Sequence, residues 1–139
     1  MAIMIKVYLL TNHDKRAADI RKWFKANKLG RAISLTAKPA LADLFVVAGG
    51  DGALLHAIRV LGKYAKPFFG INRGTSGFLL NPIETAEELT QVLEKFSACK
   101  LIKLHMLKGE LTSGNGNKIK SFYAFNDFYV KAARGNCRI

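Results

Sequence analysis

The chain has 139 residues, half of them hydrophobic, and its 22 Lys and Arg residues against 10 Asp and Glu residues give a net charge of +12. This length fits one ordinary domain, or one domain and part of another, and the apolar content excludes general disorder. The charge favours polyanionic partners such as nucleotide phosphates, nucleic acid or an acidic membrane surface, without choosing among them.

The first ten residues, MAIMIKVYLL, are apolar but contain Lys6 and no signal-peptide cleavage pattern. They predict a buried strand over residues 3–10 and no membrane span. The two cysteines, Cys99 and Cys137, form no C-x-x-C pair, and no paired histidine ligands are present. A disulfide framework or a zinc site is therefore not predicted, and a reducing cytoplasm is the expected location.

Residues 1–99 predict alternating strands and helices. Apolar, β-branched runs indicate strands, and apolar side chains at helical spacing indicate helices, the first within 13–29 and capped by Asn12 or Asp14. The remaining strands are expected at 33–35, 44–48 and 68–71, and the remaining helices at 53–64 and 85–96. This alternation predicts an α/β fold with a Rossmann-like open parallel sheet, flanked by helices.

Residues 100–139 lack a helical period. The segments KGELT and KIKSFYAF flank SGNGN, whose Gly and Asn residues suit a hairpin turn. We expect the beginning of an all-β domain that is incomplete, because two or three strands do not close a sandwich or barrel. Either a second copy completes the sheet or the chain is a fragment of a longer protein, which is the interpretation we favour.

The sequence GGDG follows the strand predicted at 44–48. In an open α/β sheet, ligands bind beyond the carboxyl ends of the strands, and Gly49, Gly50 and Gly52 would let backbone N–H groups approach an anion there. Asp51 fits this site if it binds Mg²⁺ or accepts a proton from a hydroxyl that attacks a phosphate. Alternatively, Asp51 only caps the following helix, and the glycines only form a turn.

A second glycine loop, GINRGTSGFLLNP, follows the strand predicted at 68–71, and it contains Gly74 and Gly77. It matches neither the P-loop nor the G-x-G-x-x-G motif. Phe78 either packs against a purine or belongs to the core. Further along, the segment FNDFYV places Asn126 and Asp127 between aromatic residues on an apolar strand, where they either satisfy a bend or hold ligand groups.

The order of three motifs in this chain resembles that of the NAD kinase family: a GGDG loop, then GxNxGxxGFL, then an Asn–acidic pair in a β region. The form GINRGTSGFLLN is similar to the bacterial members of that family. The family transfers the γ-phosphoryl group of ATP, or of polyphosphate, to the 2′-hydroxyl of the adenosine ribose of NAD, which makes NADP. The resemblance implies a cytoplasmic kinase that uses Mg²⁺, binds NAD and ATP and self-associates into a homo-oligomer. It implies no specific nucleic acid and no membrane as partners.

The resemblance also implies roles for individual residues. Asp51 is the implied catalytic aspartate, with Gly52 beside it, and Phe78 is implied to contact the adenine region. The nucleotide-binding residues that we predict in all are Gly49, Gly50, Gly52, His56, Gly74, Gly77, Phe78, Asn126 and Asp127.

Two features depart from the family. Ala53 stands where members usually carry Thr, so a hydroxyl that assists phosphate binding is absent. Family chains are about twice as long, and the segment that carries much of their nucleotide pocket is missing here. We therefore expect that this chain alone is an inactive fragment.

Three other interpretations stay open. A diacylglycerol- or sphingosine-type lipid kinase shares the GGDG loop, but GTSGF differs from its second loop. A non-catalytic nucleotide-binding or regulatory module is compatible with the short chain and with Ala53. A nucleic-acid binder fits the charge, and steep salt dependence of binding would identify it.

Overall fold

The computed structural model describes residues 4–11, 15–26, 29–30, 32–133 and 136–138. The chain forms two compact units, Met1–Leu101 and Ile102–Ile139. Whether they correspond to a kinase-like domain and to the beginning of a β-rich domain stays a prediction.

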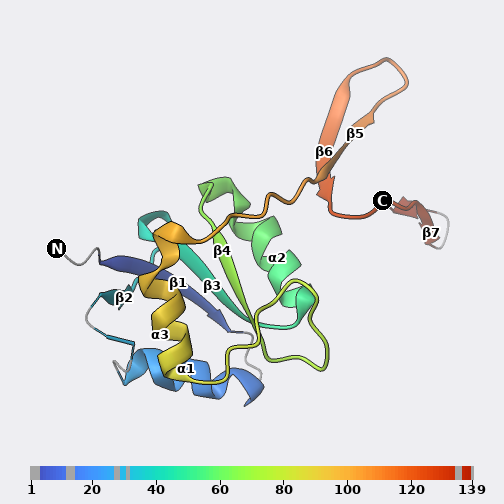
Figure 1. Ribbon diagram of the computed structural model, residues 1–139. Coiled ribbons are helices and arrows are strands. Elements are labelled where there is room, and N and C mark those ends of the chain that lie inside the picture. The colour runs from blue at the N-terminus through green and yellow to red at the C-terminus, as the bar shows by residue number, and fades with distance from the viewer. Residues whose placement is uncertain (1–3, 12–14, 27–28, 31, 134–135, 139) are drawn as a thin grey trace. The chain divides into compact units, whose positions relative to one another are not determined.

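The first unit is built on a parallel sheet with the strand order β2-β1-β3-β4 (Figure 1). Its strands and α-helices are β1 (Ile5–Thr11), α1 (Ala18–Lys25), β2 (Ile33–Leu35), β3 (Leu44–Gly49), α2 (Asp51–Leu61), β4 (Phe68–Asn72) and α3 (Ala86–Glu94). Each element lies within a few residues of its predicted position. The proposed caps Asn12 and Asp14 lie outside the described residues.

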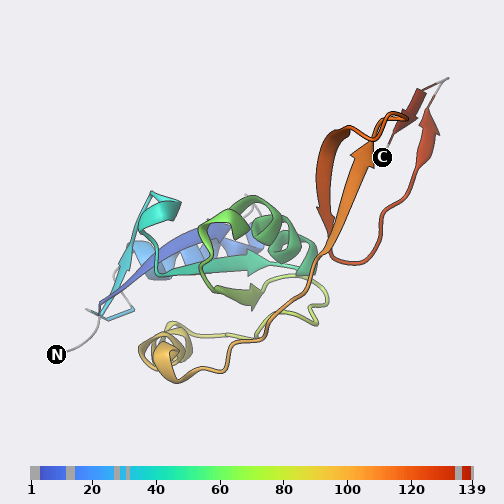
Figure 2. The same ribbon diagram turned by 90° about the horizontal axis from the view of Figure 1, so that it is seen from above.

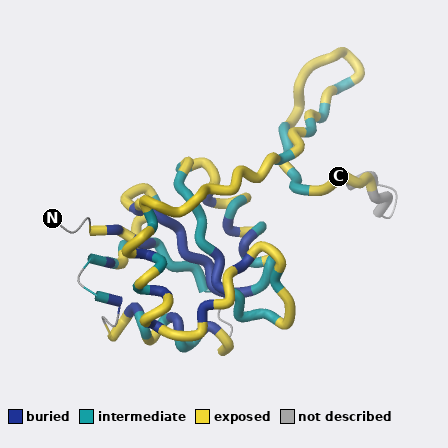
Figure 3. Tube along the Cα trace, in the orientation of Figure 1, coloured by how far each residue is buried: buried dark blue, intermediate teal, exposed yellow. Residues whose placement is uncertain are grey.

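Helices cover both faces of this sheet, as Figure 2 shows from above. On β3, Leu44, Val46 and Ala48 pack against α1 and α3, whereas Phe45 and Val47 face α2. All six residues of β3 are buried, and the run of buried residues is visible in Figure 3. Burial on both faces explains why the strand is continuously apolar instead of alternating between apolar and polar residues.

The chain connections place a candidate binding edge. The β1–α1–β2 connection leads away from β1 in one direction, and the β3–α2–β4 connection leads away from β3 in the other. The strand order therefore reverses between β1 and β3. In open α/β sheets, the crevice beyond the carboxyl ends of the strands at this reversal is where ligands bind.

Helix α3 follows the second glycine loop and has a complete N-terminal cap. The Thr85 side chain accepts a hydrogen bond from the Glu88 N–H at 3.1 Å, and the Glu88 carboxylate accepts one from the Glu84 N–H at 2.8 Å. The first backbone N–H groups of a helix have no carbonyl partner within the helix. Here the Thr85 and Glu88 side chains accept hydrogen bonds from two N–H groups at or just before the start of α3. This cap fixes where the chain ends the loop and begins the helix.

The second unit contains two antiparallel pairs of strands. Strands β5 (Leu107–Thr112) and β6 (Lys118–Ala124) form the predicted hairpin, and its turn contains Gly116 with φ of +83°. Strands β7 (Lys131–Ala133) and β8 (Asn136–Arg138) form the other pair. The predicted α/β fold followed by a β-rich segment is confirmed.

Candidate functional site

Asp51 is the first residue of α2, and the residue before it, Gly50, is the N-cap with extended backbone (φ −100°, ψ 179°). No side chain caps this helix. The interpretation of Asp51 as a helix cap is therefore wrong. At the first helical position its side chain leaves the helix start and reaches a different loop.

The Asp51 carboxylate joins the two glycine loops. Its Oδ2 accepts a hydrogen bond from the Phe78 N–H at 3.0 Å, and its Oδ1 accepts one from the Leu79 N–H, also at 3.0 Å. A negative charge at this place is further favoured by the positive end of the α2 dipole. Two segments separated by 27 and 28 residues in sequence are thus connected through one side chain.

The second loop, residues 73–80, leaves the end of β4 and returns to its edge. Asn81 pairs with Ile71 as an isolated parallel bridge, with hydrogen bonds of 2.8 and 2.9 Å on either side. At the start of the loop, the Arg73 N–H donates to the Gly49 carbonyl oxygen at 2.9 Å, and the Gly74 N–H donates to the Asn72 side chain at 2.9 Å. The loop is therefore bonded to β3 as well as to β4.

Glycines permit tight packing within each of the two loops and, at Gly74, between them. A Cβ atom on Gly74 would lie 3.2 Å from the Cα atom of Gly50, and one on Gly49 would lie 2.8 Å from the Cβ atom of Ala53. A Cβ atom on Gly77 would lie 3.0 Å from the Leu80 side chain. The packing of this site therefore requires glycine at these positions, whether or not a ligand is bound.

Ala53, the departure from the family pattern, packs its methyl group directly beside Gly49. The backbone N–H of Ala53 donates to the Gly50 carbonyl oxygen at 3.0 Å in the first turn of α2. Position 53 thus directly follows GGDG in the first turn of α2, where a side-chain hydroxyl would be close to the predicted phosphate-binding backbone.

Arg73 connects the second loop to α1. Its Nε and NH2 groups donate to Asp19 Oδ2 at 3.1 and 2.9 Å, and its guanidinium lies 5.6 Å from the centre of the Trp23 ring. Burial alone would raise the pKa of the Asp19 carboxyl, but Arg73 and the Ile20 N–H lower it below its ordinary value of 3.8. The sequence did not predict this contact, because 54 residues separate the partners.

Phe78 does not belong to the core: its side chain is 93 % exposed. Leu79, beside it, is 42 % exposed, so the two residues whose N–H groups bond to Asp51 both present apolar surface to solvent. His56 lies on α2, is exposed, and its Nδ1 is 3.4 Å from Arg59. Asp51, Phe78 and the glycines of both loops therefore lie together in the first unit.

Asn126 and Asp127 belong to the second unit. The prediction that they occupy an apolar strand is wrong, because β6 ends at Ala124 and both residues are exposed. The pairing of β6 with β5 ends where Leu107 meets Ala124, so the chain beyond it has no partner in that hairpin. The predicted ligand role of the pair is untested by this arrangement.

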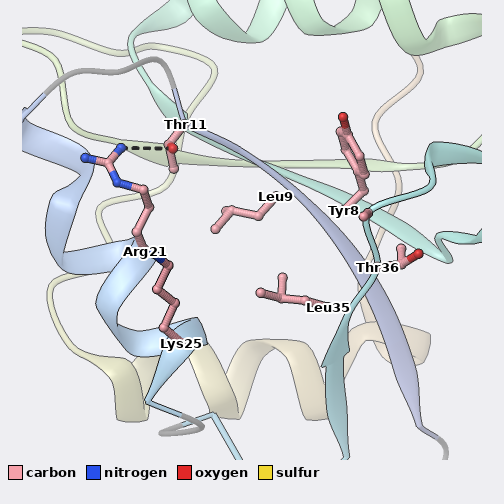
Figure 4. Close-up of a pocket in the computed structure, with 8 residues that line it drawn as sticks. Tyr8, Leu9, Thr11, Arg21, Lys25, Leu35 and Thr36 are labelled. Atoms are coloured by element: carbon pink, nitrogen blue, oxygen red, sulfur yellow. Dashed lines mark hydrogen bonds between the residues drawn. The ribbon is translucent and has the colours of Figure 1, made fainter.

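An open hollow of about 430 Å³ lies elsewhere on the first unit, at the carboxyl ends of β1 and β2 (Figure 4). The hollow exists because the pairing of β1 with β2 ends at Val7 and Leu35. The later part of β1 therefore has no neighbouring strand on that side. Arg21 reaches across from α1 to donate to the Thr11 hydroxyl at 2.9 Å. None of the predicted site residues lines this hollow, whose lining residues are Tyr8, Leu9, Thr11, Arg21, Lys25, Leu35, Thr36 and Ala37.

Within the described residues, no group of three or more His, Cys, Asp or Glu side chains is placed to hold a metal ion. The carboxylate at the glycine loops, Asp51, is already bonded to two backbone N–H groups. These residues do not form a metal site of their own. No described helix is long and apolar enough to cross a membrane.

The family model of the ATP-NAD kinase N-terminal domain matches residues 5–101, which include both glycine loops. The chain belongs to the ATP-NAD kinase family. This membership confirms the resemblance carried by GGDG and GINRGTSGFLLN.

Relatives in this family are longer than this chain. The NAD kinase of Rickettsia conorii is 31% identical over 113 residues, which are 78% of this chain and 40% of that protein. The NAD kinase of Alcanivorax borkumensis is 37% identical over 94 residues, which are 64% of this chain and 31% of that protein. The chain thus spans at most two fifths of the length of these two relatives.

The fold of the chain is similar to that of a solved structure. The crystal structure of yeast NADH kinase in complex with NADH superposes with a TM-score of 0.58, over 89% of this chain and 47% of that chain. At 16% sequence identity this likeness concerns the fold alone.

Proposed function

We propose that the protein to which this chain belongs is an NAD kinase, which transfers the γ-phosphoryl group of ATP to the 2′-hydroxyl of the adenosine ribose of NAD. Polyphosphate is the alternative donor. The observation that carries the proposal is the position of Asp51, a carboxylate between two glycine loops at the carboxyl edge of a parallel sheet, in a chain of this family.

In the proposed reaction, Asp51 accepts the proton of the ribose 2′-hydroxyl while that oxygen attacks the γ-phosphorus. The bond from the γ-phosphorus to the bridging oxygen of ATP breaks, so the products are NADP and ADP, and the proton later passes to water. Each carboxylate oxygen has two acceptor positions, and each Asp51 oxygen accepts a hydrogen bond from one backbone N–H of the second loop. One position on each oxygen is therefore left for the substrate hydroxyl.

The glycine loops supply the proposed contacts to phosphate. Gly49, Gly50 and Gly52 surround the start of α2, whose unpaired N–H groups and dipole favour an anion. Gly74 and Gly77 line the facing loop, and His56 is one turn further along the helix. Phe78, with most of its ring exposed, offers a flat apolar face to the adenine.

Mg²⁺ is proposed to accompany the phosphates of ATP, where it would neutralise charge on the transferred group. Because the described residues form no metal cluster, no step is assigned to a metal held by this chain alone. Asn126 and Asp127 are proposed to hold the nucleotide in the complete protein. The cytoplasm as location and a homo-oligomer as assembly are proposed as well.

The test is an NADP-formation assay on the folded 139-residue chain with ATP, Mg²⁺ and NAD. Inactivity of this chain and activity of the complete protein would support the proposal, with the activity lost on Asp51→Asn. A complete protein that binds ATP and NAD without making NADP would identify a non-catalytic nucleotide-binding module instead. Substantial transfer by the Asn variant would refute the role of Asp51.

A further inference from the structure

The second glycine loop is tied down near both of its ends. Near its far end, the Phe78 and Leu79 N–H groups bond to Asp51. At its beginning, Arg73 bonds through its backbone to Gly49 and through its side chain to Asp19. The residues between these anchors, Gly74–Gly77, include no helix or strand that would hold them in place.

The Arg73 side chain is directed away from the loop and toward α1. Besides the bonds to Asp19, its NH1 group donates to the Asn72 carbonyl oxygen at 2.7 Å, and its guanidinium stacks near Trp23. The side chain is only 11% exposed. The Asp19 side chain is 41% exposed. The mostly buried guanidinium has these partners in place of water, so removal of Asp19 would leave a buried charge with fewer partners.

We infer that Asp19 and Arg73 are positioning residues, which hold the second glycine loop against the first. The pair fixes Arg73, the Arg73 N–H fixes the distance to Gly49, and the loop then presents Phe78 and Leu79 to Asp51. The Arg73 guanidinium bonds to Asp19 and to the Asn72 carbonyl oxygen, so the proposed role requires no contact between these side chains and a nucleotide. The effect on nucleotide binding rests on the proposed function, whereas the effect on the loop itself does not.

Long-range charge and loop positioning predict opposite effects of Asp19→Asn on ATP binding. Removal of a negative charge from a site that binds phosphate should strengthen ATP binding, if only long-range charge matters. Loss of the ion pair should instead loosen the loop and weaken ATP binding. The sign of the change therefore separates the two explanations.

The experiment compares hydrogen exchange of the Gly74, Phe78 and Leu79 amides in the 139-residue chain and in its Asp19→Asn variant. Asp43→Asn is the matched control, because it removes the same charge from a carboxylate that bonds one backbone N–H, that of Lys6. We expect exchange at the loop amides to be about tenfold faster in Asp19→Asn and unchanged in the control. Equal exchange in the two variants would overturn the inference.

Arg73→Lys is the second variant, for the case that Asp19→Asn does not fold. Lysine keeps the charge but lacks the planar fork that bonds Asp19 and stacks on Trp23. If the pair positions the loop, hydrogen exchange of the loop amides is faster in Arg73→Lys also. Exchange as slow as in the unchanged chain would contradict the positioning role.

Titration of each variant with ATP and Mg²⁺ provides the second measurement. We expect ATP to bind several-fold more weakly to Asp19→Asn than to Asp43→Asn, and tighter binding would contradict the positioning role. Absence of ATP binding by every form of the chain would concern nucleotide binding by this part of the protein and not the positioning role, which the exchange data then decide alone.

Discussion

Asp51 illustrates how one side chain can have a structural and a chemical role. Both carboxylate oxygens accept backbone N–H groups from the opposite loop, and neither caps the helix that Asp51 begins. If Asp51 only capped α2, Asn would replace it at little cost, because Asn caps about as well as Asp. The observed contacts require two acceptor oxygens, which Asn does not have.

We therefore predict that Asp51→Asn lowers the free energy of unfolding by about 1–2 kcal/mol, because one loop N–H then faces an amide NH₂ group. If Asp51 were only a helix cap, the same substitution would leave the free energy of unfolding nearly unchanged. Urea unfolding followed by Trp23 fluorescence measures the change. Asp43→Asn, where one amide oxygen can still accept from Lys6, should be near neutral, and equal losses in the two variants would contradict the prediction.

Gly49 is the last residue of β3, and it is buried directly below the start of α2. A Cβ atom there would lie 2.8 Å from the Ala53 Cβ atom, which a helix holds in place. We predict that Gly49→Ala costs about 1–3 kcal/mol through overpacking. Gly62→Ala is the control, because a Cβ atom on Gly62 meets nothing within 4 Å and its backbone is helical. Thermal unfolding of the two variants tests this, and similar stabilities would show that the turn adapts.

The contact between α1 and the loop after β4 depends on pH. The folded-state pKa of Asp19 lies below 3.8, so the charged carboxylate stabilises the fold above about pH 4 and this contribution is lost as the pH falls through the folded pKa. We predict that the unchanged chain exceeds Asp19→Asn in stability at pH 7, and that the difference shrinks toward pH 3. Urea titrations at the two pH values measure it, and a difference independent of pH would rule out the ion pair as its source.

The first unit contains the apolar core of the described chain. All of the buried residues found among the residues with described side chains lie between Ile5 and Leu93. In the second unit, large apolar side chains such as Ile119, Tyr123 and Tyr129 are mostly exposed. The packing free energy of the first unit thus comes from the helices, strands and loops of that unit.

From this distribution we predict that residues 1–101 fold without the rest of the chain. Trp23, the single tryptophan of the sequence, reports unfolding in both chains. The free energy of unfolding of the shorter chain should agree with that of the 139-residue chain within about 0.5 kcal/mol. A shorter chain that does not fold, or that loses several kcal/mol, would show that residues 102–139 stabilise the first unit.

Local sequence alone determined the fold class and the order of the elements. Strands such as β3 are apolar throughout because helices cover both faces, and the helices carry apolar residues at regular spacing, so each element is encoded within its own residues. The hairpin at 113–117 was equally local, since its Gly and Asn residues favour the turn. The two glycine loops were recognisable for the same reason.

Tertiary structure decided what Asp51 contacts and what holds the second loop. The partners of Asp51 are 27 and 28 residues away, and Arg73 meets Asp19 across 54 residues. Such pairs depend on how the sheet brings α1 and the ends of β3 and β4 together, which local propensity does not specify. The sequence likewise predicted Asn126 and Asp127 on a strand from their apolar neighbours. A strand also needs a pairing partner, and β5 begins only at Leu107, opposite Ala124, so it offers none to these two residues.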